Sequence, residues 1–377
     1  MINSEISEIK KQFNHENSSI MKVSGCYVDG EKNVKTEFTQ TFLTLPEEET
    51  FKYFEIFKKT LSGRIGKNLI NMEFPMETEF DGGTQQFLLR LRDSELKDEA
   101  LLDEFYKKVI DSYDYTGNYL ILMIYAAYDV PGKTNDNILM EDASDEVYSY
   151  ILCSLCPVKL SKPGLSYNDE TSQFQKRIQD WVVSMPSNGF LFPAFHDRSS
   201  DIHNILYYSK DPEELHNDFV DQLLGCRVPL SAGGQKETFQ TLIQETLGEE
   251  CEYGIVRNIH EKLNEIIEEH DEKEIPEPLA LDKAEVKNLF TESGIEEDKL
   301  KDFDANYEKL TGENTSLLAA NVTNTRAFEV KTPDVVIKVN PERADLVETK
   351  IVDGRRCLVI AINDQVEVNG IVVKPSC

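Results

Sequence analysis

The chain has 377 residues, of which 40% are hydrophobic, 9% aromatic and 29% charged, a balance typical of a folded globular protein. Its 69 Asp and Glu against 40 Lys and Arg give a formal net charge of -29. This charge disfavours non-specific binding to nucleic acid and to anionic membranes. It suits either a solvated surface or a protein partner with a basic surface.

The N-terminal segment and the cysteines indicate the compartment. Residues 1–19 carry acids where a secretory signal has a basic patch and an apolar stretch. The longest apolar run, residues 119–128, is far shorter than the roughly 20 residues that cross a bilayer. Seven dispersed cysteines favour free thiols over disulfides. The sequence therefore predicts a cytoplasmic protein without a membrane span.

Residues 1–160 predict a mixed helix and sheet unit in an α+β fold. Its predicted helices begin after Ser4, after Pro46 and near Glu95, each with apolar residues at helical spacing. A hairpin is predicted around Asp29-Gly30, and residues 119–128 read as a strand buried on both faces. Residues 147–160 predict a further strand.

The pattern of residues 161–270 predicts a mainly helical unit that packs on the first unit. The predicted helices span residues 171–183, 212–224, 236–247 and 252–269, and the first places the only tryptophan, Trp181, in a core.

The remaining chain predicts a linker and a third unit. Residues 271–278 are acidic and contain prolines, which is typical of a linker. Residues 279–377 predict a helical hairpin followed by a small antiparallel β module, with turns at Asp353-Gly354 and Asn369-Gly370.

Two short motifs point to chemistry but lack the required spacing. Residues 62–68 (SGRIGKN) resemble a phosphate loop, yet only two residues separate the glycines and no hydroxyl follows Lys67. We expect a helix end and a turn there. Cys153 and Cys156 form a CxxC in a predicted strand without a second ligand pair, so buried free thiols are expected over zinc or redox chemistry.

The densest group of candidate site residues is His196, Asp197, Asp201 and His203. Imidazole and carboxylate together are what a divalent metal or a general base requires. The spacing matches no established zinc motif, so a hydrogen-bonded loop is the alternative. We assign no further catalytic residues, since no GxSxG or HExxH motif is present.

A basic and aromatic patch is a weaker candidate for an anionic or nucleotide-like ligand, because acids interleave with it. The alternative is a solvated face. Its members are Lys159, Lys162, Tyr167, Phe174, Arg177 and Trp181.

Several runs of the chain resemble a bacterial family of unknown function, domain of unknown function 4317, found mainly in Gram-positive anaerobes. The runs include CYVDGEK (26–32), KTLSGRIGKNLINMEF (59–74), CPVKLSKPGLSYN (156–168) and IQDWVVSMPSNGFLFPAF (178–195), with residues 201–208. The resemblance implies a cytoplasmic bacterial protein and no assigned activity, cofactor or catalytic residue.

Three functions remain open. The leading hypothesis is a non-enzymatic binding or regulatory protein that engages a macromolecular partner through its β-rich tail or acidic surface. The alternative is a metal-dependent hydrolase of the phosphoester type, with a divalent metal held by the His196 to His203 cluster. The third is a nucleic-acid mimic, which would explain the charge.

Overall fold

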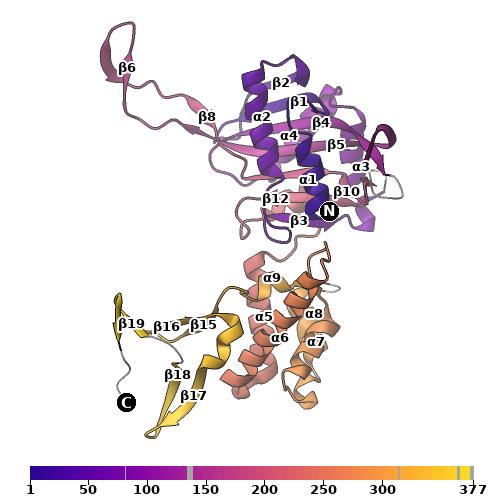
Figure 1. Cartoon of the computed structure of the whole chain (residues 1–377). Helices are drawn as coiled ribbons and strands as arrows, with labels where there is room; N and C mark the ends of the chain where they lie inside the picture. Colours follow the sequence, from indigo (N-terminus) through magenta and orange to yellow (C-terminus); the bar gives the residue numbers. More distant parts are fainter. Residues whose placement is uncertain (81, 134–138, 313–314, 363–365, 374–377) are drawn as a thin grey trace. The chain divides into compact units, whose positions relative to one another are not determined.

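The computed structural model describes the whole chain except residues 81, 134–138, 313–314, 363–365 and 374–377 (Figure 1). It contains two compact units, residues 1–231 and 232–377. Helices and antiparallel sheets occur in both, so the predicted α+β class is confirmed. Within the described residues, we find no helix whose length and apolar character would let it cross a membrane.

The first unit is built on one antiparallel sheet of eight strands. Its order is β2-β1-β4-β5-β9-β12-β3, and β8 pairs with the end of β5. The strands are β1 (Ile20–Val28), β2 (Val34–Thr41), β3 (Leu69–Glu73), β4 (Asn118–Lys133), β5 (Leu139–Leu160), β8 (Trp181–Val183), β9 (Asn188–Phe192) and β12 (Asn204–Ser209).

Helices cover both faces of this sheet. Residues of α1 and α2 belong to one apolar core with the even-numbered side chains of β4, such as Leu122 and Ile124. Residues of α3, α4 and η3 belong to the other core, with Ile121 and Met123. The continuous apolar run of β4 is therefore explained by burial on both sides. The helical segments are α1 (Asn3–Lys11), η1 (Phe42–Thr44), α2 (Glu47–Thr60), η2 (Met76–Thr78), α3 (Thr84–Asp93), α4 (Glu99–Ser112) and η3 (Phe219–Leu224).

Two small hairpins complete the first unit. One pairs β6 (Leu165–Asn168) with β7 (Gln173–Lys176), and the other pairs β10 (Ala194–His196) with β11 (Ser199–Asp201). The predicted helix over residues 171–183 is wrong, because these residues include β7 and β8. Trp181, predicted to lie in a core, is 54% exposed. Phe174, Ile178 and Val182 lie four residues apart, a spacing that fits one face of a helix and also one face of a strand.

The second unit combines helices with short hairpins. The turns predicted at Asp353-Gly354 and Asn369-Gly370 are confirmed, and all four residues have positive φ. The elements are α5 (Ala232–Leu247), η4 (Gly248–Glu250), α6 (Tyr253–Glu272), β13 (Ala280–Leu281), α7 (Lys283–Glu292), η5 (Glu297–Leu300), α8 (Phe303–Thr311), β14 (Leu317–Leu318), α9 (Ala319–Val322), β15 (Phe328–Lys331), β16 (Val336–Val339), η6 (Pro341–Leu346), β17 (Val347–Val352), β18 (Arg355–Ile360), β19 (Val366–Val368) and β20 (Ile371–Val373).

Along the chain, the division between the two compact units falls between residues 231 and 232, whereas the sequence predicted divisions at residue 160 and at residues 271–278. Residues 161–231 contribute β8, β9 and β12 to the first unit, because their strands complete the sheet. The acidic residues 271–278 lie inside the second unit, where they form the end of α6 and most of the loop to β13. An exposed loop within a unit has the same composition as a linker between units.

Candidate functional site

His196 and Asp197 lie at the tip of the β10–β11 hairpin. His196 pairs with Ser199, which leaves Asp197 and Arg198 as a two-residue turn. Both turn residues have positive φ, 46° and 61°. This geometry is favourable for glycine and asparagine but costs energy for arginine, so surrounding contacts must hold the turn in place.

Helix α1 supplies those contacts. The buried carboxylate of Glu5 accepts a hydrogen bond from the Asp197 backbone N–H at 2.9 Å and one from the Ile2 N–H at 2.8 Å. The Arg198 guanidinium donates to both oxygens of Glu8, at 2.8 and 3.0 Å, and to the Pro131 carbonyl at 2.7 Å. The turn is thus fastened to the first helix of the chain.

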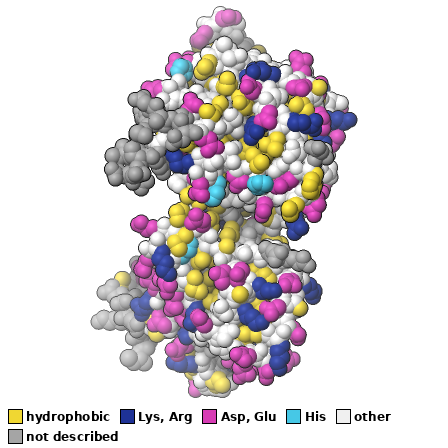
Figure 2. Space-filling model, turned by 90° about the vertical axis from the view of Figure 1, so that its right-hand side faces the viewer, with side chains coloured by type: hydrophobic (Ala, Val, Ile, Leu, Met, Phe, Trp, Pro, Cys, Tyr) yellow, Lys and Arg dark blue, Asp and Glu magenta, His cyan; other side chains and the backbone are white. Residues whose placement is uncertain are grey.

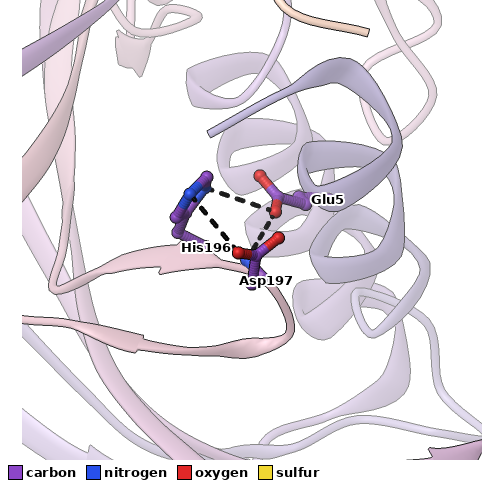
Figure 3. A group of neighbouring side chains, drawn as sticks. All are labelled: Glu5, His196 and Asp197. Atoms are coloured by element: carbon purple, nitrogen blue, oxygen red, sulfur yellow. Dashed lines mark hydrogen bonds and ion pairs between the residues drawn. The ribbon is translucent and has the colours of Figure 1, made fainter.

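A three-residue group of possible metal ligands results (Figure 3). His196 Nδ1 lies 3.7 Å from Glu5 Oε1, and His196 Nε2 lies 3.8 Å from Asp197 Oδ2. Oxygen and imidazole nitrogen are ligands that zinc and similar divalent ions accept. Against this use, Glu5 already accepts two backbone hydrogen bonds, and the Asp197 side chain is 93% exposed.

The other two predicted ligands have different partners. Asp201 accepts hydrogen bonds from the His203 backbone N–H at 3.0 Å and from the Asn204 side chain at 2.8 Å. His203 Nδ1 lies 2.6 Å from Glu79 Oε1, and this hydrogen bond raises the pKa of the imidazole. The structure therefore joins two of the four predicted residues to Glu5 and directs the other two to separate contacts.

The two short sequence motifs have structural roles. Cys153 and Cys156 are buried free thiols in opposite cores, as predicted, and burial raises the pKa of both. Residues 62–68 form the turn between α2 and β3, where the Asn68 side chain donates to the carbonyls of Ser209 and Lys210 at 3.1 Å.

A polar cleft of about 610 Å³ lies at one end of the sheet. Tyr113 donates to Asn188 Oδ1 at 3.0 Å, and the Asn188 amide donates to Tyr207 at 3.0 Å and Ser209 at 3.2 Å. The His216 ring lies 4.6 Å from the Tyr113 ring, and burial lowers its pKa. The polar groups of Tyr113, Asn188, Tyr207 and Ser209 satisfy one another, so they form a network that stabilises this end of the sheet.

The basic and aromatic patch has a form that the sequence did not predict. Its residues lie on a two-stranded ribbon, residues 158–183, which we call the arm (Figure 1). Leu160 pairs with Trp181, and Tyr167 pairs with Phe174. Backbone hydrogen bonds from Ser161 to Asp180 and from Arg177 to Gly164 continue the same register between these pairs. The arm is therefore one hairpin that extends beyond the sheet.

The outer half of the arm has one apolar and one polar face. Side chains alternate between the faces of a strand, and directly paired residues share a face. Leu165, Tyr167, Phe174 and Ile178 thus lie on one face, which we call the arm face, and they are 76%, 53%, 73% and 78% exposed. Gln173 and Gln175 lie on the opposite face. Alternation in LSYN and QFQK was the available signal for this hairpin.

The chain was also compared with known proteins. A family model described as a domain of unknown function (DUF4317) matches residues 1–371, which is nearly the whole chain. This match confirms the family resemblance of the quoted runs. No curated protein matches the sequence.

Proposed function

The chain belongs to the DUF4317 family, and we propose that it is a binding protein whose arm docks on another protein. The observation that carries this proposal is the arm face, four large apolar side chains that are each more than half exposed. An apolar face that alternates with a polar one is typical of a hairpin packed on one side. Exposed apolar patches of this kind mark interaction sites.

The energetics of an isolated hairpin support a partner. A two-stranded ribbon is marginally stable at best in water, and in the described part of the chain β6 and β7 pair only with each other. The Tyr167 and Phe174 rings lie 5.4 Å apart and form the main cross-strand aromatic contact. Docking would bury these rings and order the hairpin.

The charge of the arm indicates the chemistry of the partner. Residues 158–183 hold four Lys and Arg and three Asp and Glu, whereas the rest of the chain holds 36 and 66. The arm is thus a slightly cationic segment in a strongly anionic protein. It fits an apolar surface bordered by carboxylates, since complementary charge guides association.

We also place the protein in the bacterial cytoplasm. The cysteines of the described residues are free, and Cys26, Cys153, Cys156 and Cys226 are buried. Free thiols suit a reducing compartment.

A photocrosslinking experiment tests the docking proposal. A photoreactive amino acid replaces Phe174 on the arm face in the full chain, and a matched variant carries it at Gln175 on the polar face. We expect irradiation in lysate of the source organism to give a defined adduct from position 174 and little from position 175. Equal labelling from both positions, or no adduct from position 174, would contradict the proposal.

Binding to the protein identified in that adduct is then measured with purified components. We expect Phe174→Ser/Ile178→Ser to raise the Kd at least about tenfold, since buried aromatic anchors dominate interfaces. The matched control Gln173→Ser/Gln175→Ser changes the polar face of the same hairpin. An unchanged Kd in the arm-face variant would refute docking through this face.

The second candidate function is a metal-dependent hydrolase, and the observation in its favour is the Glu5, His196 and Asp197 group. His196 and Asp197 would supply ligands, with Glu5 as a shared carboxylate. Elemental analysis of protein purified without chelator tests this function. Near-stoichiometric metal that is lost with His196→Ala would support it, and protein without metal would exclude it.

A further inference from the structure

We infer that the partner of the arm is a second copy of this chain, so that two copies exchange arms reciprocally. This inference rests on the proposed function and names its partner. The arm of one copy would dock on the body of the other, and the second arm would dock in return. Such an arrangement is a closed twofold interface, in which each contact occurs twice.

Charge complementarity is the first argument. The acidic excess lies outside the arm, where 66 Asp and Glu face 36 Lys and Arg. Asp and Glu side chains are spread over the face of the molecule that Figure 2 shows. The net charge predicts a partner with a basic surface. In this arrangement the cationic arm of a second copy provides that basic surface.

The start of α2 provides a matching surface. Leu43 in η1 is 74% exposed and precedes the acidic first turn of α2 by four residues, and Phe51 in the next turn of α2 is 48% exposed. Glu47 and Glu48 precede Phe51 by four and three residues, so they share its side of the helix. We call Leu43, Glu47, Glu48 and Phe51 the acceptor surface. It combines apolar and anionic side chains, whereas the arm face combines apolar side chains with Lys176.

The size of the contact favours reciprocity. Eight large apolar side chains of the arm are between 40% and 78% exposed. At about 180 Å² each, they present roughly 800 Å² in total. Docking one side of one arm would bury about 400 Å² on the arm and about as much on its acceptor, which is below the roughly 1,200 Å² in total that a specific, stable interface buries. Two reciprocal contacts reach roughly 1,600 Å², the standard size of a stable interface.

A charge-swap experiment on the full chain tests the inference. One variant, Lys176→Glu/Arg177→Glu, reverses the charge of the arm, and the other, Glu47→Lys/Glu48→Lys, reverses the acceptor surface. In each variant alone, like charges would oppose one another at both contacts. In an equimolar mixture, each arm would meet an acceptor of opposite charge.

Sedimentation analysis measures the mass of each sample across a concentration series. We expect a dimer for the wild-type chain, at least about tenfold weaker association for each variant alone, and a heterodimer on mixing. Added salt should weaken the wild-type dimer, because the charges are exposed and screened. Matching urea unfolding curves confirm that the variants are folded.

Different results would contradict the second copy as partner, the acceptor surface and the proposed function. A wild-type chain that is monomeric at all concentrations would overturn the second copy as partner, while an adduct with another protein from position 174 would leave the docking proposal intact. A wild-type dimer whose variants do not associate on mixing would overturn the acceptor surface. Absence of any adduct from position 174 would instead remove the proposed function.

Discussion

The central sheet and the arm are made of strands from the same stretch of chain, yet their surroundings are opposite. β5 is buried on both faces at Ile151 to Leu155 and continues past Leu160 into a ribbon whose apolar side chains are exposed. The sheet is stabilised by helices of its own chain. The described part of the arm has the same kind of residues without such a cover, and our proposal that another molecule covers it rests on this difference.

Core truncation gives the largest expected difference between these regions. Phe190 is fully buried, with its ring 6.3 Å from Phe105 and 6.5 Å from Phe219. Phe190→Ala should lower the free energy of unfolding by about 3 to 5 kcal/mol, because it leaves a cavity. Phe174→Ala in the arm should change it by less than about 0.5 kcal/mol at concentrations where the chain is monomeric. Urea unfolding measures both variants. Similar losses of unfolding free energy in the two would contradict the difference between the sheet and the arm.

The buried polar network gives the next largest effect. Asn188 is 1% exposed and bonds to Tyr113, Tyr207 and Ser209. Asn188→Ala should lower the free energy of unfolding by about 2 kcal/mol, since three buried hydroxyl groups each lose a partner. Gln175→Ala on the exposed arm serves as the matched control with almost no expected change. A neutral result at Asn188 would mean that the network adds nothing to stability.

Removing the contacts between the β10–β11 turn and α1 should lower the free energy of unfolding by a smaller amount. Arg198→Ala removes the contacts to Glu8 and Pro131 and should destabilise the first unit by about 1 kcal/mol. Arg198→Gly removes the same contacts but relieves the positive φ of 61°. Thermal unfolding should therefore rank the glycine variant above the alanine variant. The reverse order would contradict backbone strain at this turn.

The smallest effect is a pH dependence at His203. Its folded pKa is raised above 6.5 by the hydrogen bond to Glu79, so protonated His203 stabilises the fold below about pH 6.5. That contribution is lost as the pH rises through the folded pKa. Because the pair is exposed, it should amount to about a few tenths of a kcal/mol.

The His203 contribution is measured by difference. Wild-type protein and His203→Gln are unfolded in urea at about pH 6 and about pH 8. The wild-type chain should lose more stability than the variant between these values. Partly buried His216, whose pKa is lowered by burial, contributes with the opposite sign, so it must be present in both proteins. Identical pH dependence in the two would exclude the His203–Glu79 pair as its source.

The sequence was sufficient to predict elements whose residue pattern follows directly from their burial or backbone geometry. β4 was predictable because burial on both faces leaves a continuous apolar run, and the hairpins at Asp353-Gly354 and Asn369-Gly370 were predictable because those residues favour positive φ. The helix predicted over 171–183 failed because Phe174 and Ile178 satisfy both periodicities.

The candidate site was less accessible to sequence reasoning. Glu5 contacts Asp197 across 192 positions, and no local pattern records a contact of that length. His196 and His203 are close in sequence, yet a hairpin separates their partners. The arm residues were recognised as basic and aromatic, but the fact that Tyr167 and Phe174 share a face follows only from the pairing of two strands.

Tryptophan fluorescence tests docking of the arm most directly, since the chain has a single tryptophan, Trp181. Trp181→Phe/Phe174→Trp moves it to the arm face. As the protein concentration rises, we predict that the tryptophan emission shifts to the blue and that acrylamide quenches it less. The midpoint of both changes should lie at the protein concentration at which sedimentation shows half of the chains in dimers. The same substitutions combined with Lys176→Glu/Arg177→Glu should keep the emission of an exposed indole. Exposed emission at every concentration in the first protein would contradict self-docking of the arm.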